Sequence, residues 1–63
     1  MLNHKDWIIN IENAAAEVSR LLGMETVRQV LRKHGARTIE DLCPAYYSKV
    51  FDELDFMAND ARD

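Results

Sequence analysis

The apolar residues in the first third of this 63-residue chain recur at alternating spacings of three and four. These residues are Ile8, Ile11, Ala15, Val18 and Leu22. On an α-helix this spacing places all of them on one face, because 3.6 residues make one turn. Asn3 is the predicted N-cap and Gly23 the predicted left-handed residue after the last turn, so we expect a helix over about 4–22. Such an apolar face leaves water only by packing against other elements of the chain.

Two further segments have the pattern of partner helices. In the first, the residues with helical spacing are Val27, Val30, Leu31 and His34, flanked by Met24. The last turn of this helix contains the basic residues Arg32, Lys33 and His34, which interact favourably with the negative end of the helix dipole. Gly35 is predicted to end the helix in a left-handed conformation. The second is expected over about 44–58, because Pro44 suits the first position of a helix. Its apolar face consists of Tyr47, Val50, Phe51, Leu54, Met57 and Ala58.

These elements predict an all-α fold, a compact three-helix bundle with a short extra helical turn between helices 2 and 3. The extra turn is expected over 39–42, because Thr38 and Asp41 have the spacing of a capping box. A single domain should span 1–63, since so short a chain buries only about 60% of its unfolded surface. No β-strand is required, and residues 59–63 are expected to fray.

Composition and charge narrow the function classes. The chain is 48% hydrophobic and 30% charged, which is typical of a globular protein. Its formal net charge is −3, and the acidic residues gather in the C-terminal half. An acidic surface repels nucleic-acid phosphates, so nucleic acid is the less favoured partner.

Cys43 is the single cysteine, which favours a reducing compartment, and we expect a cytoplasmic protein. No apolar stretch approaches the roughly 20 residues that cross a bilayer, so no membrane role is expected.

The residue types do not favour catalysis or metal binding. Cys43 has His34 as its nearest histidine in sequence, but a core this small leaves no room to enclose a substrate. We expect Cys43 to be a small buried residue at a turn. His4, His34 and Cys43 lack the spacing that aims two ligands at one ion. The chain is therefore predicted to be no enzyme, with no metal and no cofactor.

A basic cluster is the strongest signal for nucleic-acid binding. It consists of Arg28, Arg32, Lys33 and Arg37. A helix-turn-helix aligned on Gly35 needs an apolar residue where Asp41 stands, and Pro44 interrupts the second helix of that motif. The favoured interpretation is a solvated face on which Glu25 pairs with Arg28 or Gln29.

Two apolar residues fall outside the predicted faces. Ile9 lies well away from the apolar face of its helix, and Phe56 points almost opposite Leu54 and Tyr47. Trp7 and Tyr46 lie at the edges of their faces, where half-buried aromatic rings are common. We expect Trp7 at the edge of the core. Phe56 is as well suited to a contact with another molecule as to ordinary exposure.

The runs 27–36 (VRQVLRKHGA), 38–42 (TIEDL) and 44–54 (PAYYSKVFDEL) resemble small helical accessory proteins of phages and conjugative elements of Gram-positive bacteria. The resemblance covers about half of the chain. It implies a mobile-element protein, in a class that includes inhibitors of host defence systems. It transfers no defined site.

Three functional hypotheses follow. The leading one is a protein-interaction module, an inhibitor or adaptor, that docks on a protein partner. Its predicted contact residues are Tyr46, Lys49, Asp52, Glu53, Phe56 and Ile9. The alternative is a small nucleic-acid-binding regulator that uses Arg28, Arg32, Lys33 and Arg37. The third is a homodimer across Ile9 or Phe56, which is compatible with either of the others.

Overall fold

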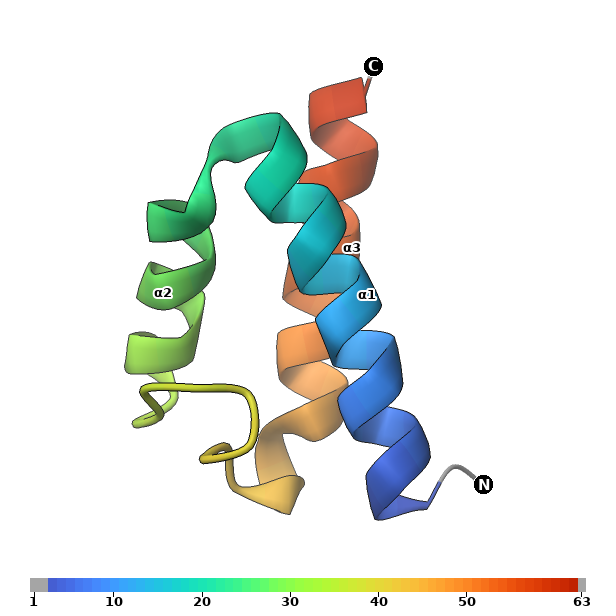
Figure 1. Ribbon diagram of the computed structural model, residues 1–63, viewed down its shortest axis with the longest axis vertical. Helices are drawn as coiled ribbons and strands as arrows, with labels where there is room; N and C mark the ends of the chain where they lie inside the picture. Colours follow the sequence, from blue (N-terminus) through green and yellow to red (C-terminus); the bar gives the residue numbers. More distant parts are fainter. Residues whose placement is uncertain (1–2, 63) are drawn as a thin grey trace.

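The computed structural model describes residues 3–62, and within them it contains three α-helices and no strand. The helices are α1 (His4–Leu22), α2 (Met24–Lys33) and α3 (Tyr47–Arg62). A single 3₁₀ turn, η1 (Pro44–Tyr46), leads into α3. Figure 1 shows α1 and α3 running in the same direction, with α2 running the opposite way beside them. The predicted all-α three-helix bundle is confirmed.

The core lies where the apolar faces of the helices meet, and α1 packs more extensively on α3 than on α2. The buried apolar residues are Ile11, Ala15, Val18, Val27, Val30, Leu31, Ala36, Leu42, Tyr47, Val50, Leu54 and Ala58. Tyr47 is buried although it is polar at its tip, because its hydroxyl lies 2.9 Å from His4 Nδ1. The predicted apolar face of α1 includes one residue too many, because Leu22 lies at the corner before α2 and is exposed.

The two ends of α1 differ in how well the sequence predicted them. Asn3 caps the helix as expected, since its Oδ1 accepts a 2.9 Å hydrogen bond from the Asp6 backbone N–H. Gly23 does not adopt the predicted left-handed helical conformation: its φ is 97° and its ψ is 154°. That backbone region is open almost only to glycine. The reason is that Gly23 also precedes the first residue of α2, so one residue makes the whole reversal.

The predicted helical turn over 39–42 is present as a single turn of the chain between α2 and η1, too short to be a helix of its own. Its capping contact does form, because Thr38 Oγ1 accepts from the Asp41 N–H at 3.2 Å. Two backbone hydrogen bonds, Asp41 N–H to Thr38 O and Leu42 N–H to Ile39 O, span three residues each and stop there. Ala36 and Leu42 are both buried, and they hold the ends of the turn against the core.

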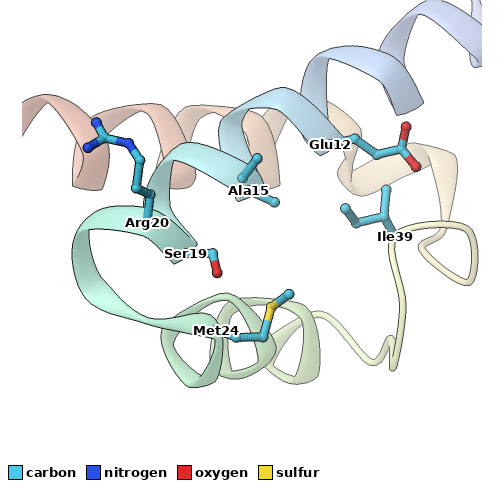
Figure 2. A pocket seen from close by; sticks show the side chains of 7 residues that line it. Glu12, Ala15, Ser19, Arg20, Met24 and Ile39 are labelled. Carbon is cyan, nitrogen blue, oxygen red and sulfur yellow. The ribbon is translucent and has the colours of Figure 1, made fainter.

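An open groove of about 500 Å³ lies between α1, the start of α2 and this turn. Its lining residues are Glu12, Ala15, Ala16, Ser19, Arg20, Met24 and Ile39. Figure 2 shows Ala15, Ile39 and Met24 extending into the same space from three different segments. The groove exists because alanine and serine side chains on this side of α1 are too short to fill it. We call it the α1–α2 groove.

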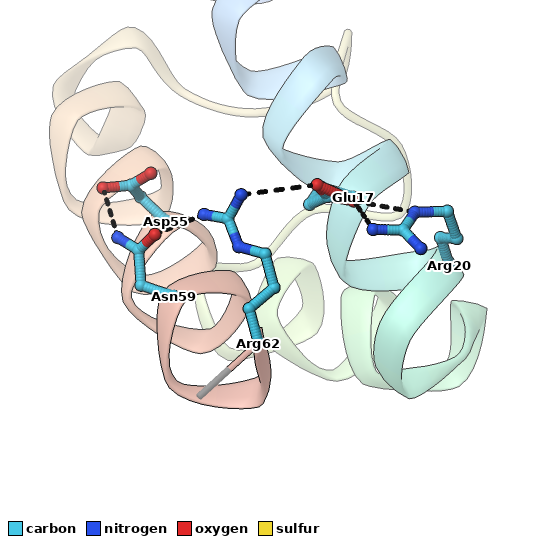
Figure 3. A network of polar contacts seen from close by, with 5 residues as sticks. All are labelled: Glu17, Arg20, Asp55, Asn59 and Arg62. Carbon is cyan, nitrogen blue, oxygen red and sulfur yellow. Dashed lines mark hydrogen bonds and ion pairs between the residues drawn. The ribbon is translucent and has the colours of Figure 1, made fainter.

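The third helix is longer than predicted. The sequence pattern predicts a helix over 44–58, but η1 occupies Pro44–Tyr46 and α3 continues to Arg62. Residues 59–62 are therefore helical where fraying was expected, and Asp63 lies outside the described residues. Figure 3 shows the reason: the Arg62 guanidinium reaches Glu17 on α1 at 3.7 Å and also donates to Asn59. These contacts hold the last turn of α3 against α1.

Truncation of the core should be far costlier than a surface change. Ile11 and Leu54 are both 0% exposed. We expect Ile11→Ala and Leu54→Ala each to reduce the free energy of unfolding by about 2–5 kcal/mol, a large part of the stability of so small a domain. Thermal melts followed by circular dichroism provide the measurement. Melting temperatures within two or three degrees of the wild type would contradict this core assignment.

Gly35 ends α2 in the predicted left-handed conformation, with a φ of 78°. The Ala36 N–H donates to Leu31 O and the Gly35 N–H donates to Arg32 O, both at 2.9 Å. This pair of hydrogen bonds is the Schellman pattern, and the burial of Leu31 and Ala36 supplies the apolar contact that accompanies it.

Gly35→Val should therefore destabilise the protein more than Gly35→Asn. A Cβ at this position meets no atom within 4 Å, so the cost arises from the backbone and not from a steric clash. A β-branched residue pays about 1–2 kcal/mol in this conformation, whereas asparagine tolerates it better. Denaturant unfolding of the two variants measures the difference. Equal midpoints would exclude this account of the cap.

Candidate functional site

Among residues 3–62, Phe56 is the most exposed of the large apolar side chains, at 69% of its surface. Asp52 precedes it by four residues and Lys49 precedes it by seven, and both are exposed. The three residues thus share the side of α3 opposite its buried residues Tyr47, Val50, Leu54 and Ala58. We call this surface the outer face of α3. It brings together three of the six residues that the sequence predicted as protein contacts.

Glu53 and Tyr46 point elsewhere, toward α2. Glu53 Oε2 accepts from Lys33 Nζ at 2.6 Å, and its Oε1 accepts from His34 Nε2 at 2.9 Å. The ring of Tyr46 is tilted against the His34 ring with centroids 5.2 Å apart. Glu53 is therefore a link between α3 and the end of α2. The sequence did not show this link, because it joins residues 19 and 20 positions apart.

The surroundings of Glu53 act on its pKa in two directions. Partial burial raises the pKa, but hydrogen bonds and positive charge from Lys33 and His34 lower it by more. The net result is a pKa below the usual value for a glutamate. At neutral pH the carboxylate is charged and its contact with α2 is fully formed.

Ile9 is separated from the outer face of α3, because it lies on α1. It is 44% exposed, while its neighbours Ile8 and Ile11 turn toward the core. Trp7 lies at the core edge as expected, with its ring centroid 6.2 Å from that of Phe51. The six predicted contact residues therefore divide among three places: the outer face of α3, the Glu53 link and the far side of α1.

The basic cluster is interleaved with carboxylates. Glu25 lies 3.5 Å from Arg28 and 3.6 Å from Arg32, which confirms the predicted pairing of Glu25 with Arg28. Lys33 is held by Glu53. Arg37 differs from the other three: its backbone N–H, and not its guanidinium, donates to Asp41 Oδ2 at 3.4 Å, and within residues 3–62 its side chain makes no ion pair. Exposed ion pairs of this kind are weak, but they reduce the positive potential that a phosphate would meet.

The cysteine and the two histidines considered for catalysis or metal binding lie in different surroundings. Cys43 is exposed, so the prediction of a buried cysteine is wrong. The adjacent Leu42 turns into the core, and Cys43 is left at the extended position before Pro44. His34 is bonded to Glu53, and His4 to the Tyr47 hydroxyl. Within residues 3–62 no three His, Cys, Asp or Glu side chains gather as a metal site would require.

The α1–α2 groove is a feature that the sequence interpretation missed. Glu12 on α1 lies at one end of the groove, and its pKa is raised by a hydrogen bond with the Glu40 carboxyl first, then by desolvation and last by the charge of Glu40. Arg20 lies at the other end and pairs with Glu17 at 2.6 Å. The run Ala14-Ala15-Ala16 was the available signal, since consecutive small residues on an amphipathic helix leave its surface recessed.

Comparisons with protein-family models, with curated proteins and with solved structures gave no match to this chain. None of the helices in residues 3–62 has the length and apolar character needed to cross a membrane.

The lowered pKa of Glu53 predicts a pH-dependent contribution to stability. Because the folded pKa lies below the unfolded one, this contribution is complete above the unfolded pKa of about 4.3 and is lost as the pH falls through the folded pKa. Glu53→Gln should therefore be less stable than the wild type at pH 7, by about 0.5–1 kcal/mol, and the gap should close toward pH 3. Thermal melts from pH 7 to pH 3 measure the stability difference at neutral pH and its decrease in acid.

Asp52→Asn is the matched control, because Asp52 is an exposed neighbour on the same helix and makes no ion pair within residues 3–62. The stability difference between Asp52→Asn and the wild type should not shrink in this way as the pH falls. If the melting temperatures of Glu53→Gln and the wild type differ by the same amount from pH 7 to pH 3, the ionised Glu53 is ruled out as the source of this stability.

Proposed function

We propose that this chain is a non-enzymatic protein-interaction module that docks through the outer face of α3. The observation that carries the proposal is the exposure of Phe56 on a helix whose other large apolar side chains are buried or half-buried. Moving a phenylalanine side chain from water into a partner gains about 1.5–3 kcal/mol. Aromatic residues are also among the commonest anchors of protein interfaces.

The charges around Phe56 support a protein partner. Lys49 and Asp52 are exposed beside it, and within residues 3–62 neither makes an ion pair. Their side chains are available to pair with charges across an interface, which sets the orientation and the rate of association more than the affinity. An aromatic anchor with a charged surround is the usual anatomy of such a contact.

A nucleic-acid-binding regulator is the second candidate, and the exposed arginines of α2 favour it. Arg28 and Arg32 lie one helical turn apart and both are more than half exposed. Glu25 lies between them, and the chain as a whole is acidic, with a formal net charge of −3. These negative charges weaken phosphate binding, so we rank this function below protein docking.

The biological setting is part of the same proposal. The resemblance to accessory proteins of mobile elements favours an inhibitor or an adaptor, because both act by occupying the surface of another protein. A cytoplasmic location fits the single exposed thiol, Cys43, which a reducing compartment keeps unpaired.

Replacement of Phe56 should separate binding from folding. We expect Phe56→Ser to leave the helicity and melting temperature nearly unchanged and to weaken protein binding or self-association by about 1 kcal/mol or more. The experiment is affinity capture from the native host with the full chain as bait, in which proteins retained by the wild type and lost by Phe56→Ser are quantified. Phe56→Leu is the matched control, since it keeps an apolar side chain at the same place.

The variant Arg28→Glu with Arg32→Glu tests the second candidate beside the first. If it abolishes binding while Phe56→Ser retains it, the basic face of α2 is the working surface and protein docking through α3 is wrong. A salt titration of nonspecific DNA binding distinguishes the same two functions independently. A steep loss of binding with salt would favour the nucleic-acid function.

A further inference from the structure

We propose that the α1–α2 groove docks an amphipathic helix of a protein partner, one that has a lysine or arginine at the edge of its apolar face. This contact goes beyond the proposed docking of Phe56 and is separate from it, because the groove lies on α1, α2 and the turn after α2, whereas Phe56 lies on α3. A chain that has both surfaces holds two proteins together, as an adaptor does.

The apolar surface of the groove continues along α1. Met24, which is 51% exposed, and Ile39, which is half-buried, extend into the groove from α2 and from the turn (Figure 2). On the α1 side Ala16 is exposed, and Ile9, 44% exposed, precedes it by seven residues, or two helical turns, on the same side of the helix. From Ile9 to Arg20 this side of α1 is about 16 Å long, which matches about three turns of a docked helix.

Two carboxyl groups at one end of the groove select a basic residue in the partner. Glu12 on α1 and Glu40 on the turn share a hydrogen bond, which raises the pKa of Glu12. Figure 2 shows Glu12 beside Ile39, at the end of the groove opposite Arg20. Within residues 3–62 neither carboxyl makes an ion pair. An ammonium or guanidinium group placed between them replaces their mutual repulsion with two charge-assisted hydrogen bonds.

The basic side chains at the opposite end and on α2 already have carboxylate partners. Arg20 donates to Glu17 from Nε at 2.8 Å and from Nη2 at 2.6 Å. Arg28, one turn after the start of α2, lies 3.5 Å from Glu25. Their charges are therefore compensated within the chain, and the groove has its uncompensated charge at the Glu12 end.

The side chains around the acidic end leave it negative. Lys5 lies two turns before Glu12 on the same side of α1, about 10 Å away along the helix axis. The turn contributes Arg37 and Asp41 in addition to Glu40. Three carboxylates thus face two cations, so the potential at this end of the groove attracts a basic partner.

The exposed apolar face of this chain itself is a poorer occupant. On the outer face of α3, Asp52 lies one turn before Phe56 and Asp60 one turn after it, with Lys49 as the one cation beside them. A second copy that inserts Phe56 into the groove therefore brings more carboxylates than cations to a site that is already acidic. A partner helix with basic residues beside its apolar face meets no such repulsion.

The probe is a blocked peptide of about 15 residues that has leucine at helical spacings and lysine at its polar positions. A second peptide with glutamate in place of every lysine is the control for charge. Isothermal titration calorimetry of each peptide into the full chain gives the dissociation constants. We expect the lysine peptide to bind at least about tenfold more tightly than the glutamate peptide, because only its charges complement the acidic end of the groove.

Variants of the chain locate the bound peptide, and circular dichroism verifies that each is folded. Met24→Ser should weaken binding of the lysine peptide about tenfold, because it removes one apolar wall of the groove. Glu12→Gln should weaken it about two- to fivefold, the effect of one exposed ion pair. Asp52→Asn removes the same charge outside the groove and is the matched control. Both Asp52→Asn and Phe56→Ser should bind the peptide as the wild type does.

Three results would overturn the inference. The first is a lysine peptide that binds no better than the glutamate peptide, or that does not bind at about millimolar concentration. The second is loss of binding in Phe56→Ser but not in Met24→Ser, which would place the peptide on α3. The third is self-association of the wild type that Met24→Ser abolishes, which would make a second copy the occupant. The capture experiment with Phe56→Ser decides the proposed function separately, because that variant keeps the groove intact.

Discussion

The packing of α1 against α3 is the interaction on which the rest of this structure depends. Ile11 and Val18 on one helix and Val50 and Leu54 on the other are the largest fully buried side chains. A domain of this size has few such residues, so each one carries a large share of the hydrophobic stabilisation. The two helices run in the same direction, which requires α2 and the segment after it to make the return path between them. The single-residue corner at Gly23 and the anchored turn at Ala36–Leu42 both follow from this requirement.

Polar contacts orient the helices after the apolar faces have brought them together. Glu53 fixes α3 against the end of α2, and Arg62 with Glu17 fixes the last turn of α3 against α1 (Figure 3). Both links use side chains that are at least partly exposed, so each adds little stability compared with the core. The outward direction of Lys49, Asp52 and Phe56 follows instead from the burial of the opposite side of α3.

The surface that remains after this packing is uneven in a way that suggests its use. Phe56 projects from α3, and the groove beside Met24 is recessed because α1 has alanine and serine on that side. A projecting aromatic ring and an apolar recess on the same small chain are both unfavourable in water. The proposed docking of a protein partner through Phe56 removes the aromatic ring from solvent. The basic residues of α2 are instead interleaved with carboxylates that moderate their charge.

The sequence alone determined the helices, because the spacing of Ile11, Ala15 and Val18 and of Val50 and Leu54 depends only on the helical repeat. It also determined the cap at Asn3 and the left-handed Gly35, since both are local requirements of a helix end. The helical repeat likewise predicted that Phe56 points away from the core. Only the tertiary structure decided the position of Glu53, the length of α3 and the exposure of Cys43, because each depends on residues distant in sequence. The groove belongs to this second class: it exists only where α1, Met24 and Ile39 meet.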